Sequence, residues 1–432
     1  MRRFVILLLA LPIAVFSQQD SQSAGQQSQS SPGQNPLTTL ASEFFSGDFV
    51  NFHGTAAGVY EANQGLLGNG QGGAGGFMLG GGVQAFHQFR DSELSLGYTL
   101  DYTHYQNGGY NSGFVQNLSL AYTKRLSRRW SLGLIESAGM YRYGVSYYGQ
   151  PNGPTPAIAN PFSPVTKFLS SGLSLTYRQT ARLSYIFSGN FYLSRYSYPG
   201  AIGTTGVTGS GSVSYRLTER TTIGGTYSHS YYTYQHDAGQ ATIDGVYLNL
   251  SHQFLQYWTA SADVGLSRSN SSGIIRTPVN VIFNGQQITG YLVGPYKLDK
   301  LTPSISGSVS RRFRRMVATG SVGQGVNPGN GVYLASRNRF ITGTVSYSTL
   351  RSNISASGGW FHLTSLANTV STGYSTGSFG LSYGYTLTRH LSANARYDYF
   401  RYGGLYTFSG GGDNRFTFGI TFSSKTVPLT LF

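Results

Sequence analysis

The stretch ELSLGYTLDYTHY, residues 93–105, decides the fold. Its even positions from Leu94 to Tyr102 are all leucine or tyrosine, whereas its odd positions from Ser95 to Thr103 are serine, glycine, threonine or aspartate. Side chains of a β-strand point to opposite faces at successive residues. The pattern therefore predicts a strand with one apolar face and one polar face.

The same alternation recurs along most of the chain. Further examples lie at 117–123, 245–251, 258–267 and 378–387. No segment after the N-terminal region repeats its apolar residues with the 3.6-residue period of a helix. A strand that crosses a bilayer needs about 9 to 11 residues, and the full alternating segments, of about 11 to 15 residues, exceed that length.

Short and long connections alternate between these segments. Short turns, often basic, are expected at 90–92, 126–129, 180–181, 218–219, 255–256, 311–315, 349–352 and 388–390. Longer loops rich in Gly, Asn, Tyr and Pro are expected at 62–75, 106–112, 146–166, 197–203, 235–240, 271–299, 327–334, 366–372 and 404–412. Eight turns and nine loops join eighteen strands. An even strand number returns the C-terminus to the side from which the N-terminus enters.

Composition indicates what covers the two faces of the strands. Charged residues are 10% of the 432 residues, too few to cover a soluble domain, which carries about 25%. A mean hydropathy of −0.18 excludes a bundle of apolar membrane helices. The polar face is too small for a packed core, so it suits a wet lumen, and unpaired strand edges cannot persist in lipid. We predict an all-β, transmembrane antiparallel β-barrel of about 18 strands, with short periplasmic turns and long extracellular loops.

The chain divides into three predicted regions. Residues 1–17 have basic residues followed by a 13-residue apolar run, typical of a signal peptide and too short to span a bilayer as a helix. Residues 18–44 are rich in Gln and Ser and are expected to be a disordered periplasmic segment. Residues 45–432 are expected to form the outer-membrane β-barrel.

The alternation assigns individual side chains to lipid or lumen. We expect lipid contact for Leu94, Leu118, Val246, Ala262, Leu381 and Phe418, and a lumen position for Ser95, Ser119, Ser251, Asp263 and Ser382. Tyrosines near strand ends predict aromatic girdles: Tyr105, Tyr143, Tyr196, Tyr198, Tyr231, Tyr232, Tyr257 and Tyr402. Glu136 falls in the lipid phase, so we expect a β-bulge that turns it inward.

Charged residues suggest how a pore could select solutes. Arg178, Arg216 and Arg312 fall in the lumen phase beside short turns and are expected to form a cationic rim at the periplasmic mouth. Neutralisation of lipid phosphates in the periplasmic leaflet is the alternative role for arginines at the turns. Arg396 and Asp398 share the inward face of one strand and predict an ion pair in the lumen. Two further acidic points on the predicted lumen wall are Asp101 and Asp263.

The sequence offers no motif for catalysis or cofactor binding. Cysteine is absent, and the eight histidines show no metal-ligand spacing. The glycine run 72–82 lacks the lysine of a phosphate-binding loop. No basic stripe with interleaved aromatic residues indicates nucleic-acid binding. We therefore expect no enzyme activity, no catalytic residues, no cofactor, no metal and no nucleic-acid partner.

The signal, the repeated hairpins over about residues 45–424 and the C-terminal Phe432 resemble bacterial outer-membrane β-barrel proteins, specifically large porins and exopolysaccharide-export barrels. The resemblance implies the outer membrane of a Gram-negative-type bacterium, contact with outer-membrane lipids, and recognition of the last strand by the barrel-assembly machinery. The family's assembly signal has apolar residues at every second position before the last, but this chain has Thr430, Pro428 and Thr426 there. The clearest final strand is 416–422, so the residues after Ser424 are expected to be a tail.

The predicted function is an outer-membrane pore for passive diffusion of small hydrophilic solutes, with a mild anion bias, because barrels of 16 to 18 strands leave an aqueous channel. One alternative is an export conduit for an acidic polysaccharide, guided by a cationic lumen. Another is a non-conducting surface adhesin that acts through residues 271–299. Assembly as a homotrimer, and entry of 146–166 or 271–299 into the lumen, stay open at this point.

Overall fold

The computed structural model describes most of the predicted barrel region. The described residues are 49–63, 73–106, 112–142, 165–197, 202–236, 238–255, 257–283, 286–328, 335–366, 373–403 and 411–424. The predicted signal peptide, the Gln/Ser-rich segment, residues 146–164 of the predicted loop 146–166 and the residues after Ser424 lie outside them. No helix within the described residues is long and apolar enough to cross a membrane.

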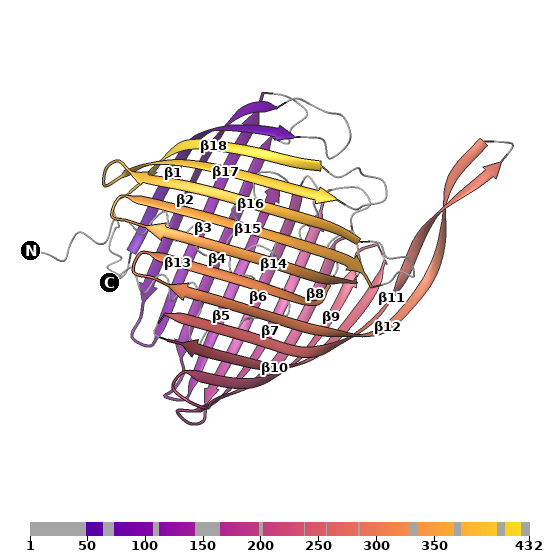
Figure 1. The fold of residues 1–432 in the computed structure, drawn as a ribbon, viewed down its shortest axis with the longest axis horizontal. Coiled ribbons are helices and arrows are strands. Elements are labelled where there is room, and N and C mark those ends of the chain that lie inside the picture. The colour runs from indigo at the N-terminus through magenta and orange to yellow at the C-terminus, as the bar shows by residue number, and fades with distance from the viewer. Residues whose placement is uncertain are drawn as a thin grey trace, which may run out of the picture.

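Eighteen β-strands form a single antiparallel sheet that closes on itself (Figure 1). Each strand pairs with its neighbours in the sequence, and β18 pairs with β1, which confirms the predicted fold class. The strands are β1 (Phe49–Asn63), β2 (Ala74–Gln88), β3 (Ser92–Tyr105), β4 (Gly113–Arg125), β5 (Trp130–Arg142), β6 (Val165–Arg178), β7 (Leu183–Tyr196), β8 (Thr204–Arg216), β9 (Thr221–Tyr234), β10 (Gly239–Phe254), β11 (Trp258–Phe283), β12 (Gln286–Arg312), β13 (Met316–Pro328), β14 (Ala335–Ser348), β15 (Ser352–Ser365), β16 (Gly373–Thr386), β17 (Leu391–Gly403) and β18 (Gly411–Ser423).

The seam of the barrel, where β18 meets β1, is a continuous ladder. Its register runs from His53 opposite Ser423 to Asn63 opposite Asp413. Beyond the end of β18, the backbone N–H of Ser424 donates to the carbonyl oxygen of Phe52 at 2.7 Å. The final strand is therefore the one that the 416–422 pattern predicts.

The two faces of the strands follow the predicted phase. Val246 is 61% exposed and Phe418 is 67% exposed on the outside of the barrel. Serines in the opposite phase meet one another across strands inside the barrel, as Ser355 and Ser382 do with oxygens 2.6 Å apart. The outer face is thus apolar and the inner face hydroxylated, as a membrane barrel with a polar lumen requires.

Cysteine labelling can test this assignment directly because the chain has no cysteine of its own. We expect a water-soluble thiol reagent to label Ser251→Cys, on the lumen face, in the folded barrel. Val246→Cys, five residues earlier on the outer face of β10, should react only with a lipid-soluble reagent. Equal labelling of both variants by the aqueous reagent would contradict a lipid-facing outer wall.

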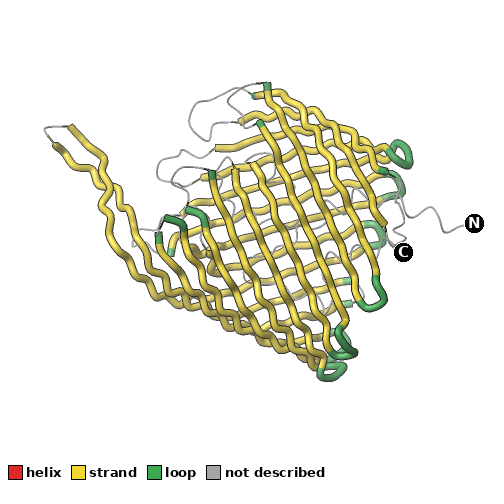
Figure 2. Tube along the Cα trace, turned by 180° about the vertical axis from the view of Figure 1, so that it is seen from behind, coloured by secondary structure: helices red, strands yellow, loops and turns green. Residues whose placement is uncertain are grey.

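Short turns lie at one end of the barrel, and the chain enters and leaves at that same end (Figures 1 and 2). Several turns share one local motif, in which a Ser or Thr hydroxyl accepts hydrogen bonds from backbone N–H groups two and three residues later. At 179–182, the hydroxyl of Thr180 accepts from Arg182 and from Leu183 at 3.2 and 3.0 Å. The same motif is built on Ser127, Thr349 and Thr388. These side chains close the turn without glycine.

The prediction of a loop over 271–299 is wrong. Strands β11 and β12 have 26 and 27 residues and remain paired with each other from Trp258 opposite Arg311 to Phe283 opposite Gln286. Pairing of β11 with β10 stops at Gly273, and pairing of β12 with β13 begins at Ile305. The excess length is a two-stranded ribbon that projects past the barrel at the long-loop end, away from the lumen (Figures 1 and 2).

Aromatic girdles are present, but several predicted members are wrong. Tyr105 and Tyr232 are in the inward phase and are 3% and 5% exposed. Tyr143 and Tyr198 lie outside the described residues. Outer-face rings instead contact one another between neighbouring strands, stacked in the pairs Trp130–Tyr177 and Tyr177–Tyr185 and tilted in the pairs Tyr102–Phe114 and Tyr397–Phe416. The girdle residues are those in lipid phase, and nearness to a strand end alone does not identify them.

The predicted β-bulge at Glu136 is also wrong. The ladder passes through Glu136 without interruption, with Leu120 opposite it on β4 and Ser171 on β6. Its carboxylate stays in the outward phase and accepts a hydrogen bond of 2.6 Å from the Ser171 hydroxyl. An outward-facing partner on the next strand thus takes the place of the expected rotation toward the lumen.

Candidate functional site: the lumen wall and its mouth

The inner wall of the barrel carries many paired hydroxyl groups, and toward the long-loop end it also carries buried apolar side chains such as those of Phe340 and Tyr374. Serines and threonines on adjacent strands lie directly opposite one another, with oxygen–oxygen distances of 2.5–3.1 Å. These pairs are Thr55–Thr421, Ser188–Ser210, Thr208–Ser230, Ser261–Ser308, Thr319–Thr344, Ser321–Thr342 and Ser355–Ser382. Each hydroxyl has further hydrogen-bonding capacity toward water. These hydroxyl pairs are uncharged and compatible with water.

Asp263 lies in this wall, in the inward phase of β11, and is held by neutral groups. Its Oδ1 accepts from the side-chain amide of Asn249 at 2.6 Å, and its Oδ2 accepts from the Ser306 hydroxyl at 3.1 Å. The carbonyl oxygen of Asn249 accepts in turn from Thr226 at 2.8 Å. This network crosses β9, β10, β11 and β12, and it fixes the carboxylate against the wall.

Arg396 and Asp398 also lie inward, on β17. The guanidinium Nε of Arg396 donates to Oδ2 of Asp398 at 2.7 Å. Asp398 is almost fully buried and lies opposite Arg415 of β18, which lies opposite Glu61 of β1. A row of alternating charge, Asp398–Arg415–Glu61, therefore crosses the seam of the barrel.

Further acidic side chains gather around Arg415. Asp413 and Asp101 are both close enough to it for electrostatic interaction. The Tyr105 hydroxyl donates to a carboxylate oxygen of Glu61. We call the group Glu61, Asp101, Tyr105, Arg396, Asp398, Asp413 and Arg415 the seam cluster. Of the predicted lumen residues it unites Asp101, Arg396 and Asp398, whereas Asp263 is distant along the sheet, on β11.

Removing one acid of the seam cluster should destabilise the barrel. Asp398→Ala would remove the carboxylate to which Arg396 donates and one of the two acids that lie opposite Arg415, at an expected cost of roughly 3 kcal/mol in the free energy of unfolding. Denaturant titration in detergent micelles measures this change. Asp299→Ala, which removes the partner of the exposed Arg268, should leave stability nearly unchanged. An equal loss in both variants would contradict a structural role for the seam cluster.

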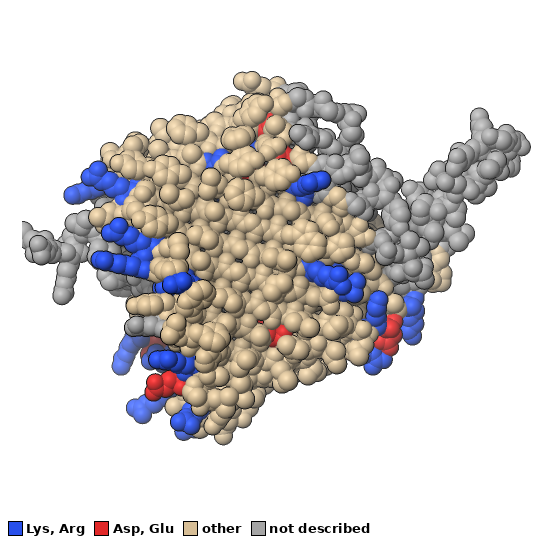
Figure 3. Space-filling view, viewed as in Figure 1, with Lys and Arg blue, Asp and Glu red and all other residues tan. Residues whose placement is uncertain are grey.

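The three arginines of the predicted rim end their strands in equivalent positions. The backbone N–H groups of Arg178, Arg216 and Arg312 each close the ladder at the short-turn end, to carbonyl oxygens of Arg129, Arg182 and Tyr257 at 2.8, 2.8 and 3.0 Å. All three are exposed and in the inward phase. On the face seen in Figure 3, basic side chains gather at the ends of the barrel and the middle carries almost no charge.

Neighbouring arginines at the same end point the other way. Arg311 is in the outward phase, and its guanidinium lies over the rings of Trp258 and Phe313, 4.7 and 3.9 Å from their centroids. Arg312, the next residue, has the opposite phase. The side chains of Arg311 and Arg312 therefore project to opposite faces of one strand.

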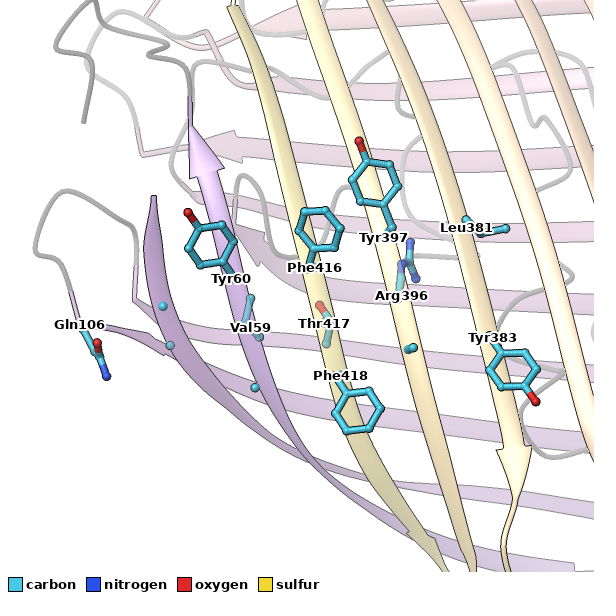
Figure 4. A pocket seen from close by; sticks show the side chains of 14 residues that line it. Val59, Tyr60, Gln106, Leu381, Tyr383, Arg396, Tyr397, Phe416, Thr417 and Phe418 are labelled. Carbon is cyan, nitrogen blue, oxygen red and sulfur yellow. The ribbon is translucent and has the colours of Figure 1, made fainter. Parts of the chain in front are cut away.

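A hollow of about 730 Å³ lies at the seam (Figure 4). Its lining is mainly the outer-face rings of Tyr60, Tyr383, Tyr397, Phe416 and Phe418. Figure 4 shows Tyr60, Phe416 and Tyr397 side by side on neighbouring strands. These rings belong to the apolar outer face, so we assign the hollow to the lipid-contacting surface and not to the solute path.

Within the described residues, no group of three or more His, Asp and Glu side chains could hold a metal ion. The closed sheet, the apolar outer wall and the hydroxylated inner wall define a membrane-spanning, porin-like β-barrel of the outer-membrane type.

Comparison with known proteins finds only distant structural similarity. No family model and no curated protein matches the sequence. Among solved structures, it is similar to Pseudomonas aeruginosa OccK5 (OpdH), with 11% identity, a TM-score of 0.44, and coverage of 88% of this chain and 98% of that chain. It is also similar to a BenF-like porin from Pseudomonas fluorescens Pf-5, with 12% identity, a TM-score of 0.44, and coverage of 88% of this chain and 100% of that chain. For the FrpB iron transporter of Neisseria meningitidis, the identity is 10%, the TM-score is 0.42, and the similarity covers 88% of this chain and 82% of that chain.

Proposed function

We propose that the chain is a pore of the outer membrane of a Gram-negative-type bacterium, through which small hydrophilic solutes diffuse passively. The observation that carries this proposal is the inner wall of paired hydroxyl groups on an 18-stranded barrel. A barrel of this strand number has room for an aqueous channel. Hydroxyl groups form hydrogen bonds with water and with solutes but carry no charge that would bind a solute tightly, which favours diffusion through the pore.

A mild anion bias is the finer part of the proposal. Arg178, Arg216 and Arg312 support it because they are exposed at the short-turn mouth in the inward phase. The acids of the seam cluster oppose it, since four carboxyl groups there accompany only Arg396 and Arg415. Charges of both signs along one path predict a weak preference, expressed mainly at the mouth.

The β11–β12 ribbon supports a second candidate function. A paired ribbon that projects beyond the barrel gives a surface adhesin a longer reach than a loop would. An adhesin does not need a conducting lumen. Export of an acidic polysaccharide is a third candidate, and it requires attraction along the whole path, which the acidic seam cluster does not favour.

A planar-bilayer recording tests the pore. The full-length mature chain, folded in detergent, is expected to insert and to produce discrete conductance steps that grow with salt concentration. Heat-denatured protein from the same preparation is the control. Folded barrels that insert but never conduct would overturn the pore and favour the adhesin.

A further inference from the structure

A second cationic site faces outward at the opposite end of the barrel from the short turns. Arg337 and Arg339 are the third and fifth residues of β14, at the end where the long loops lie. They share the phase of Ile341, which is 57% exposed on the outer face. Both guanidinium groups therefore project from the outer face of the barrel, next to the apolar side chains that face lipid.

The strands on either side complete the site. Arg339 lies opposite Gln324 of β13 and His362 of β15. Its Nε donates to Oε1 of Gln324 at 2.8 Å, which fixes the plane of the guanidinium. His362 stacks on Trp360, with ring centroids 5.9 Å apart and planes 6° apart. We call Gln324, Arg337, Arg339 and His362 the β13–β15 patch.

Within the described parts of the chain, no acid is paired with this patch. Between Asp299 and Asp398 the sequence contains neither aspartate nor glutamate, and this interval includes all of β13, β14, β15 and β16. Two like charges on one face, two residues apart, repel each other when no anion lies between them.

Two other outward-facing basic residues at the same end, Arg268 and His229, have acidic partners. Arg268 forms two hydrogen bonds to the carboxylate of Asp299, at 2.9 and 2.6 Å. His229 lies 2.7 Å from Asp244. Among the described residues, the two arginines of the β13–β15 patch have no such acid, so an anion from outside the chain can take that position.

The position of the patch identifies the chemistry of that partner. An anion held there would lie at the membrane surface, with the apolar side chains of Ile341, Trp360 and Val322 directly below. Paired guanidinium groups match the oxygens of a phosphate. We propose that the β13–β15 patch binds the phosphate of a lipid in the leaflet at the long-loop end, whose acyl chains cover that apolar surface. This binding is independent of conduction through the lumen.

Native mass spectrometry of the detergent-folded full barrel can test the proposal. The probes are dioleoyl phosphatidic acid, which carries a phosphomonoester, and dioleoylglycerol, which has the same acyl chains without phosphate. The wild-type barrel is expected to retain phosphatidic acid and not dioleoylglycerol. Because each arginine near a membrane surface contributes about 1 kcal/mol, R337Q/R339Q is expected to weaken phosphatidic-acid binding about tenfold to thirtyfold.

Three controls make the result decisive. R268Q/D299N removes a neutral ion pair at the same end and should leave binding within about twofold of wild type. Heat-modifiable gel migration shows whether each variant is folded. If the double variant does not fold, the single variants R337Q and R339Q replace it, and each is expected to weaken phosphatidic-acid binding about fivefold. Unchanged binding in folded R337Q/R339Q, an equal loss in R268Q/D299N, or displacement of the lipid by inorganic phosphate would each overturn the proposal.

Discussion

A chain that stops before Gly411 is expected to form no folded barrel at all. The truncation removes β18, which pairs with β17 on one side and with β1 on the other. Both neighbours would then present unpaired N–H and C=O groups to hydrocarbon, at several kcal/mol for each group. It also removes Asp413 and Arg415 of the seam cluster. Refolding into lipid vesicles, followed by heat-modifiable gel migration, measures the outcome.

A stop directly after Ser424 is the matched control. It keeps β18 and the hydrogen bond from Ser424 to Phe52, and removes only residues 425–432. We expect this chain to fold in vesicles as the full chain does. In cells, the resemblance to outer-membrane barrels implies that the assembly machinery reads the last strand, which here is β18. A folded band from the chain that lacks β18 would contradict closure at the seam.

The strands were predictable because lipid imposes a strict pattern on them. Leu118 and Phe418 face lipid and are apolar, and most residues of the outward phase between the turns are apolar too, although Glu136 is an exception. The strands over residues 271–299 were not predicted because the ribbon extends past the barrel, where contact with lipid does not require apolar residues at every second position. Its backbone accommodates Pro278 and Pro295 because neither β10 nor β13 pairs with it there. Proline therefore indicated a loop where the chain forms an extended edge.

The site was predictable only where its members share a strand. Arg396 and Asp398 are two residues apart, so period two alone places them on one face. Glu61 is in the first strand and Arg415 is in the last strand, and their meeting depends on the register across the seam. If the alternation of 416–422 is extended toward the N-terminus, Arg415 and Asp413 fall in the inward phase. The glycines just before Asp413 show no alternation, so the pattern did not indicate where that strand begins. No local pattern indicates which distant residue lies opposite.

Charge reversal at the periplasmic rim is expected to change ion selectivity. Replacement of Arg178, Arg216 and Arg312 by glutamate reverses three exposed charges that lie in the inward phase at the short-turn mouth. A permeating anion that is attracted there in the wild type would be repelled in the variant. The reversal potential across a salt gradient in a planar bilayer should therefore move toward cation selectivity, while single-channel conductance at high salt should change little.

Salt dependence separates the rim from other sources of selectivity. The Debye length shrinks from about 30 Å at 0.01 M to about 3 Å at 1 M, so the effect of a wide, wet mouth should fade over this range. Arg311→Glu is the control, because its guanidinium stacks on rings of the outer face beside the inward Arg312. This variant should alter the reversal potential far less than the triple variant does. If the triple variant leaves the reversal potential unaltered at low salt, then these arginines do not face the solute path, and the acids of the seam cluster become the groups that set selectivity.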